Sequence, residues 1–230
     1  MRAILLAGGF GKRLRPITKN IPKCLVPIKG IPLLEIWLKK LKDSKIKNVL
    51  INTHYLNDKV EDFIKKKNFG INIILSHEKK LLGTAGTFLK NIKFYGSSDG
   101  LLIHADNYSN EPLSNLVNAH KKRPKNCFIT ALTFKTNKTS SCGIFKVDNK
   151  NIVKNFYEKS NLSSSEIGNI ANGAIYVLSK KFILNAKKKF PKAKDFSNHI
   201  IPKMKGKIFI YNSRKKFADI GTLNSYNKLK

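Results

Sequence analysis

The chain has 230 residues, 41% of them hydrophobic, which is enough for the core of one large domain and excludes a disordered chain. Its 45 Lys and Arg residues against 14 Asp and Glu residues give a formal net charge of +31. No stretch approaches the roughly 20 apolar residues that a membrane-spanning helix needs, so we expect no membrane partner.

Apolar runs and amphipathic stretches alternate through the first half of the chain. This alternation is typical of β-α-β units around a largely parallel sheet. We therefore expect a Rossmann-like, three-layer α/β/α fold with a mixed, mainly parallel central sheet. The expected strands span 2–7, 48–53, 72–76, 100–105 and 128–134, and the expected helices span 32–43, 57–67, 85–91 and 111–122.

The pattern changes after Cys142. Residues 143–147 and 152–158 are typical of the two arms of a hairpin, which predicts a small substrate-binding β subregion. No linker, internal repeat or low-complexity segment interrupts the chain, so we expect a single domain over residues 1–230. The remaining expected elements are strands 171–178 and 207–211 and helices 179–189 and 222–229.

The three cysteines are Cys24, Cys127 and Cys142, an odd number with wide spacing and no CxxC pair. This argues against both a disulfide framework and a zinc site. The apolar start of the chain is too short for a signal peptide and runs directly into a glycine-rich loop. We expect reduced thiols and a cytoplasmic protein.

The positive charge raises the question of nucleic-acid binding. Only five of the 45 basic residues are arginines, and the lysines are spread along the chain without an aromatic stripe among them. Lysine runs of this kind are usually solvated helix ends or faces. We therefore expect no nucleic-acid partner, although the field favours phosphorylated substrates.

The most informative motif follows the first predicted strand. It runs from Leu6 to Thr18 as LAGGFGKRLRPIT and ends in the segment PKCLVPI at residues 22–28. Three glycines, Gly8, Gly9 and Gly11, let the backbone approach a phosphate chain and direct N–H groups at it. Arg13 can bind two phosphate oxygens, and Lys23 adds a compact positive charge.

Two other glycine motifs do not fit this loop. A Walker A loop requires Lys followed by Ser or Thr after its last glycine, and here Lys12 and Arg13 follow Gly11. A dinucleotide fingerprint requires a third spaced glycine, and Leu14 occupies that position.

The whole string resembles the signature of the sugar-1-phosphate nucleotidyltransferases, which include glucose-1-phosphate thymidylyltransferases and mannose-1-phosphate guanylyltransferases. The resemblance continues almost to the C-terminus, where residues 219–222 read DIGT. The short length is most similar to compact bacterial members, such as heptose-1-phosphate guanylyltransferases. The resemblance implies a nucleotide-binding half at 1–134 and a sugar-phosphate-binding half at 135–230.

The resemblance also implies the residues that contact each substrate, a nucleoside triphosphate and a sugar 1-phosphate. The implied nucleotide-binding residues are Leu6, Ala7, Gly8, Gly9, Gly11, Lys12, Arg13, Glu78, Gly83 and Thr84. The implied sugar-phosphate-binding residues are Lys23, Asn107, Gly143, Glu158, Lys159 and Asn172.

Two aspartates are the implied Mg²⁺ ligands. Asp106 follows an apolar strand, and a carboxylate at the carboxyl end of a parallel strand faces the crevice where ligands bind. Asp219 is the implied second ligand. Alanine at position 105, where the family commonly has glycine, is a small departure. His104 is interpreted as a packed residue.

We expect direct in-line transfer of a nucleoside monophosphate to the sugar phosphate, with release of pyrophosphate. Arg13, Lys23 and Asp106 are the expected catalytic residues, and no general base is needed because the attacking oxygen is already anionic. The length and the resemblance favour GTP, and the expected product would supply surface polysaccharide synthesis. The alternatives are a uridylyl- or thymidylyltransferase, or a non-catalytic nucleotide-sugar-binding regulator. The sequence does not fix the sugar or the oligomeric state.

Overall fold

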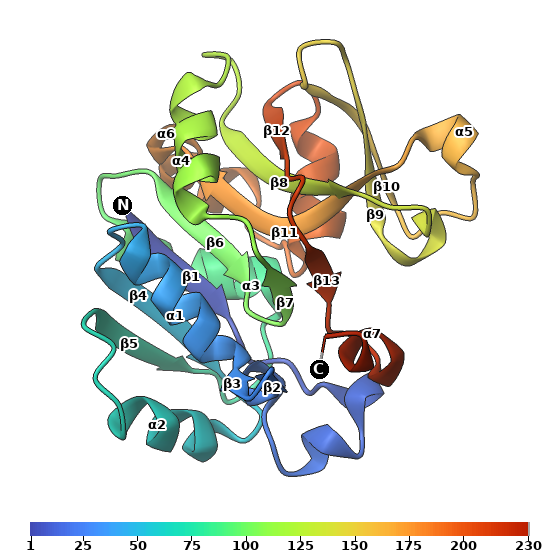
Figure 1. The fold of residues 1–230 in the computed structure, drawn as a ribbon. Coiled ribbons are helices and arrows are strands. Elements are labelled where there is room, and N and C mark those ends of the chain that lie inside the picture. Colours follow the sequence, from blue (N-terminus) through green and yellow to red (C-terminus); the bar gives the residue numbers. More distant parts are fainter. Residues whose placement is uncertain (230) are drawn as a thin grey trace.

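The computed structural model describes residues 1–229, in which a nine-stranded sheet runs through the centre of the molecule (Figure 1). Its strands are β1 (Arg2–Leu6), β4 (Asn48–Thr53), β5 (Asn72–His77), β6 (Gly100–His104), β8 (Ile129–Lys135), β9 (Gly143–Val147), β10 (Val153–Glu158), β11 (Ile170–Leu178) and β12 (Ile208–Asn212).

The sheet has a parallel block and an antiparallel extension. Strands β5, β4, β1 and β6 lie side by side in that order and are parallel. Strand β11 pairs antiparallel with β6 and with β8, and β12 is parallel to β8. The start of β11 also pairs with β9, from which the β9–β10 hairpin extends. The predicted mixed sheet and its hairpin subregion are confirmed.

Helices cover both faces of the sheet. Alternate side chains of β1 point to opposite faces, as a strand requires: Ala3 and Leu5 pack in one core, and Ile4 and Leu6 in the other. The predicted three-layer arrangement is therefore confirmed. The first face carries α1 (Leu33–Asp43), α2 (Asn57–Lys65), α4 (Leu113–Lys122) and α7 (Leu223–Asn227), and the second carries α3 (Gly83–Lys90) and α6 (Lys180–Lys189). A short helix, α5 (Ser164–Ile167), lies beside β9.

Two small sheets were not predicted. Strands β2 (Pro27–Ile28) and β3 (Ile31–Pro32) form a hairpin before α1. Strand β7 (Asn107–Ser109) pairs antiparallel with β13 (Phe217–Asp219), which places Asp219 opposite Asn107. Three-residue strands carry too little periodicity to be recognised, so only the fold reveals this pairing.

The segment between β12 and β13 is anchored by Glu111. The buried Glu111 carboxylate accepts hydrogen bonds from the Tyr211 hydroxyl at 2.9 Å, the Asn115 amide at 2.9 Å and the Ser213 hydroxyl. The hydroxyl donors lie about a hundred residues further along the chain, so one carboxylate holds the C-terminal segment that leads to Asp219.

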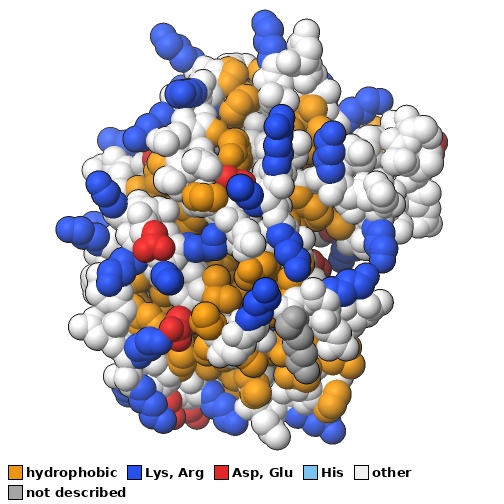
Figure 2. Space-filling view, viewed as in Figure 1, with side chains coloured by type: hydrophobic (Ala, Val, Ile, Leu, Met, Phe, Trp, Pro, Cys, Tyr) orange, Lys and Arg blue, Asp and Glu red, His pale blue; other side chains and the backbone are white. Residues whose placement is uncertain are grey.

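Basic side chains on the face drawn in Figure 2 do not form a single stripe. Figure 2 shows lysine and arginine side chains dispersed over the visible face, with few acidic groups among them. This dispersal agrees with the interpretation of the charge as solvated lysines. No helix in the described part of the chain has the length and apolar character to cross a bilayer.

Candidate active site

Two cavities meet at the carboxyl end of β6. Both are open to solvent, with volumes of about 550 Å³ for the first and about 840 Å³ for the second, and His104 and Asp106 line both. The first is otherwise lined by Leu6, Ala7, Gly8, Gly9, Lys23, Cys24, Asn52, Leu81, Gly83, Thr84 and Thr87. The second is otherwise lined by Arg13, Asn107, Phe134, Ser141, Cys142, Gly143, Glu158, Lys159, Asn172, Ala174, Asp195, Ser197, Asn198, Phe217 and Asp219.

The glycine loop leaves β1 against the side chain of Asn52. The Asn52 Oδ1 atom accepts a hydrogen bond from the Ala7 N–H at 2.7 Å. A Cβ atom at Gly8 would lie 2.9 Å from the Asn52 amide nitrogen, so the loop passes too close to β4 for a larger residue. Asn52 was not predicted, since an Asn at a strand end has no distinctive sequence signal.

The second part of the loop turns away from the first cavity. Gly11 has a left-handed φ of 63° and packs against Thr18 and Lys23. The Lys12 ammonium lies 5.5 Å from the centre of the Phe10 ring. Gly11 and Lys12 line neither of these two cavities, and their contact with the nucleotide stays a prediction.

Glu78 lies beneath the first cavity and not in its wall. The residue is 1% exposed, and its carboxylate accepts hydrogen bonds from the Thr87 hydroxyl at 2.5 Å and the Leu82 N–H at 3.1 Å. The geometry makes Glu78 a support for the loop that precedes α3.

The segment before η6 (Phe196–Ile200) contacts the N-terminus of α3. Element η6 is a π-helical turn. The Lys194 carbonyl accepts a hydrogen bond from the Ala85 N–H at 3.0 Å. The Thr84 hydroxyl donates to Asp195 at 3.1 Å and accepts from the Phe196 N–H at 2.7 Å. The glycine-rich start of α3 therefore fixes η6, and Thr84 connects the walls of the two cavities.

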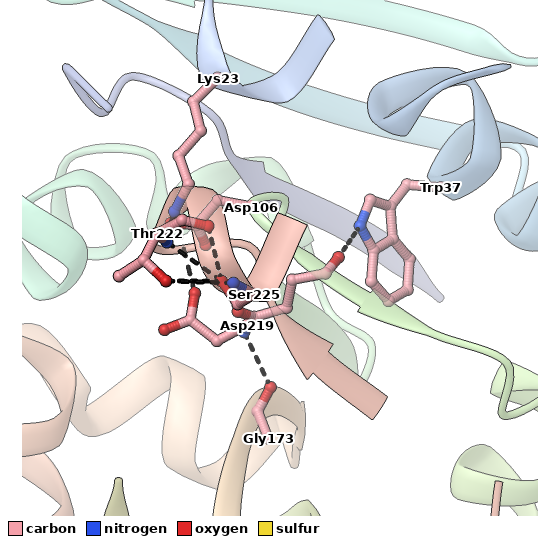
Figure 3. Close-up of polar contacts among 8 residues, drawn as sticks. Lys23, Trp37, Asp106, Gly173, Asp219, Thr222 and Ser225 are labelled. Atoms are coloured by element: carbon pink, nitrogen blue, oxygen red, sulfur yellow. Dashed lines mark hydrogen bonds and ion pairs between the residues drawn. The ribbon is translucent and has the colours of Figure 1, made fainter. Parts of the chain in front are cut away.

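Lys23, Asp106 and Asp219 converge from three separate parts of the chain (Figure 3). The Lys23 ammonium lies 2.6 Å from Asp106 Oδ2 and 3.9 Å from Asp219 Oδ1. Burial raises the pKa of Asp106, but the charges of Lys23 and His104 and the hydrogen bonds to its carboxylate together lower it more, so the net shift of this pKa is downward. Desolvation and the nearby Asp106 carboxylate raise the pKa of Asp219.

Arg13 lies next to this cluster. A Cβ atom at Gly221 would lie 2.9 Å from an Arg13 guanidinium nitrogen and 2.9 Å from Asp219 Oδ2. Arg13 also lines the second cavity. The guanidinium therefore stands beside the carboxylate pair, with its donors available to a phosphate group.

The second cavity contains all five other predicted sugar-phosphate residues. The Asn107 amide donates to the Gly173 carbonyl at 3.1 Å, and the Asn172 amide donates to the Tyr176 hydroxyl at 2.7 Å. Burial and the nearby Asp195 raise the pKa of Glu158, whose carboxylate approaches the backbone at Gly143. Besides Asn107 and Asn172, the predicted sugar-phosphate residues that line this cavity are Gly143, Glu158 and Lys159.

Sequence reasoning missed the residues that η6 contributes to this cavity. Asp195 accepts a hydrogen bond from the Asn198 N–H at 2.8 Å and so caps the turn. Ser197 and Asn198 present a hydroxyl and an amide to the cavity. The Asp-x-x-Asn spacing was an available cap signal, but nothing in the sequence placed this turn beside α3.

This combination of an α/β sheet, a glycine loop and a basic cluster around two carboxylates defines a protein that handles phosphorylated ligands. The family model for nucleotidyl transferases matches residues 2–230. The chain therefore belongs to the nucleotidyl transferase family, and the predicted sugar-1-phosphate nucleotidyltransferase family is confirmed.

Named relatives extend over most of the chain. The D-glycero-alpha-D-manno-heptose 1-phosphate guanylyltransferase of Campylobacter jejuni is 31% identical over 230 residues, which are 98% of this chain and 97% of the relative. The mannose-1-phosphate guanylyltransferase catalytic subunit beta of Drosophila melanogaster is 32% identical over 180 residues, 76% of this chain. The chain spans 47% of that subunit and 61% of a Sulfolobus acidocaldarius relative.

A solved structure shares the fold. The crystal structure of HddC from Yersinia pseudotuberculosis complexed with GMP-PN superposes with a TM-score of 0.81 at 25% identity. The match covers 99% of this chain and 97% of HddC, so the α/β arrangement is common to both molecules from end to end.

Proposed function

We propose that this protein transfers a nucleoside monophosphate from a nucleoside triphosphate to a sugar 1-phosphate and releases pyrophosphate. The observation that carries the proposal is the junction of the two cavities. Asp106 lines both of them and lies 2.6 Å from Lys23. A nucleotide in the first cavity and a sugar phosphate in the second would bring their phosphates together at this junction.

The residues at the junction fit Mg²⁺. The Asp106 and Asp219 carboxylates both lie within 4 Å of the Lys23 ammonium, so the two carboxylates can face a common cation. Magnesium accepts one or two protein carboxylates and completes its shell with phosphate oxygens and water. Asp106 and Asp219 would hold the ion, which when bound would neutralise negative charge on the reacting phosphates.

The chain's own cations would orient the reactants. A sugar-phosphate oxygen attacks the α-phosphorus, a P–O bond forms, and the bond from the α-phosphorus to pyrophosphate breaks. Lys23 stabilises charge that develops at the α-phosphate, and Arg13 binds the pyrophosphate end. Lys159, in the wall of the second cavity, orients the attacking phosphate. Catalysis is then positioning and charge neutralisation, and no proton has to be abstracted.

GTP is the nucleotide that we favour, and a manno-configured sugar 1-phosphate is the acceptor. The Campylobacter and Drosophila relatives are named guanylyltransferases of a manno-heptose and of mannose, and HddC was crystallised with GMP-PN. The product, an activated sugar, would supply surface polysaccharide synthesis.

We propose that residues 1–230 act as a single domain. The first cavity is lined only by residues up to Asp106, whereas the second is lined mostly by residues from Phe134 onward. Strand β11 of the second half pairs with β6 and β8 of the first, which supports one cooperative unit. The three free thiols support a cytoplasmic location.

The test is a pyrophosphate-release assay with Mg²⁺ that crosses GTP, UTP, dTTP, CTP and ATP with a panel of sugar 1-phosphates. We expect GTP with mannose 1-phosphate or a manno-heptose 1-phosphate to turn over best. Turnover with another base would replace the guanylyl assignment. Nucleotide binding without turnover of any pair would instead identify a non-catalytic regulator.

A further inference from the structure

His104 is half-buried, and the environment of its imidazole is unusual. Its Nε2 atom is buried and has no hydrogen-bond partner among the described residues, and neither ring nitrogen is paired elsewhere. Buried polar atoms are nearly always hydrogen-bonded, so an unpaired one requires an explanation. Sequence reasoning interpreted His104 as a packed residue, but packing alone leaves this nitrogen unsatisfied.

The position of His104 indicates that a ligand supplies the missing partner. His104 and Asp106 are the two residues that line both cavities; His104 is the last residue of β6, and Asp106 follows two residues later. The His104 ring packs edge-on against Tyr176, at 6.4 Å between centres. The Tyr176 hydroxyl in turn accepts a hydrogen bond from Asn172, in the wall of the second cavity.

The neighbouring groups identify the kind of ligand atom. The phosphate-binding cations, Arg13 and Lys159, lie in the same cavity as the polar neutral and acidic groups of Asp195, Ser197 and Asn172. A carboxylate accepts hydrogen bonds, and amides and hydroxyls both donate and accept them, so together these groups match sugar hydroxyls, which do both. A neutral imidazole offers the same two capacities, one on each nitrogen.

We propose that His104 hydrogen-bonds a hydroxyl of the acceptor sugar and is a specificity residue of the second cavity. This inference rests on the proposed function and adds a contact that the sequence pattern did not assign. His104 lines both cavities, so its side chain contacts the sugar where the sugar adjoins the nucleotide. It therefore selects sugars that carry a hydroxyl at the ring position facing His104.

The experiment uses mannose 1-phosphate and its monodeoxy analogues with GTP and Mg²⁺. His104→Phe retains an aromatic ring beside Tyr176 but removes both nitrogens, whereas His104→Gln retains a donor and an acceptor. His77→Phe, at the exposed end of β5, is the matched control. A single neutral hydrogen bond corresponds to about a tenfold change in kcat/KM.

We expect His104→Phe to raise the KM for mannose 1-phosphate about tenfold, to change the KM for GTP little, and to be partly rescued by His104→Gln. One deoxy analogue should be a poor substrate for the wild type yet suffer no further loss in His104→Phe. Equal losses on every analogue, or an effect on the GTP KM alone, would overturn the inference while the activity stands. A wild type that turns over no pair in the wider panel would overturn the proposed function itself.

Discussion

The Lys23 ammonium lies 2.6 Å from Asp106 Oδ2, although 83 residues separate the two in the sequence. Lys23 belongs to a short turn after the glycine loop, and Asp106 follows the central strand β6. The side chain of Lys23 is 9% exposed, so its charge is largely removed from water and depends on Asp106 for compensation. This pair fixes a cation at the point where the two cavities meet.

Replacement of Asp106 by Asn should abolish most of the activity without unfolding the protein. The amide keeps the size of the side chain but removes the negative charge that faces Lys23 and the metal position. Loss of one electrostatic group in an active site typically lowers kcat by about 100- to 1,000-fold. Pyrophosphate release and circular dichroism would measure the two effects. Asp62→Asn, on the exposed face of α2, is the control, and a folded Asp106→Asn with full activity would remove Asp106 from the mechanism.

Gly221→Ala should lower activity much more than stability. The added Cβ would lie 2.9 Å from both an Arg13 nitrogen and Asp219 Oδ2, which are the mobile ends of side chains and can move aside. Their displacement misplaces two groups of the junction, and we expect kcat/KM to fall at least about tenfold. Urea unfolding should give nearly the wild-type free energy. A large loss of stability with normal kcat would show that Gly221 has only a structural role.

Gly83→Ala should destabilise the protein more than Gly30→Ala, although both glycines have a φ of +77°. The backbone strain of a left-handed alanine, about 1 kcal/mol, is common to the two variants. At Gly83 the Cβ would also lie 2.4 Å from the Lys194 carbonyl oxygen, whereas the space around Gly30 is open. Overpacking of this kind costs about 1–3 kcal/mol more.

Chemical denaturation of the two glycine variants measures this difference directly. Equal free energies of unfolding would show that α3 and the segment before η6 separate easily. The hydrogen bond between Thr84 and Asp195 would then be too weak to hold the walls of the two cavities together.

Glu111→Gln should destabilise the protein at neutral pH and less so in acid. Burial raises the pKa of Glu111, but hydrogen bonds from Ser213, Asn115 and Tyr211 lower it more, so the folded pKa is below the usual value for Glu. A lowered folded pKa stabilises the fold above the unfolded pKa, and this contribution is lost as the pH falls through the folded value. We expect a cost of about 2 kcal/mol at pH 7.

Urea unfolding of wild type and Glu111→Gln from pH 7 down to pH 3.5 measures that dependence. The difference between the two free energies should stay constant down to about pH 5 and narrow below the usual Glu pKa of about 4.3. A difference that stays constant over the whole range would contradict an ionised, hydrogen-bonded Glu111.

The sequence by itself determined the elements that have a clear hydrophobic period. Strand 48–53 was predicted with the bounds of β4, and helix 32–43 differs from α1 by one residue. A run of apolar residues is a local property of the chain, and its burial follows from its own composition. The glycine loop and the position of Asp106 after a strand could also be predicted, because each is a local feature of the sequence.

Tertiary structure alone decided which residues meet. The pairing of β7 with β13 brings Asp219 to Asp106 and Lys23, and no local pattern encodes a contact between three-residue strands. Glu78 was predicted to bind the nucleotide from its place in a motif, whereas its burial and its hydrogen bonds to Thr87 and Leu82 are seen only in the fold. The unpaired nitrogen of His104 is likewise invisible in sequence. Burial and hydrogen-bond partners depend on elements far apart in the chain, so they are fixed only when the layers pack.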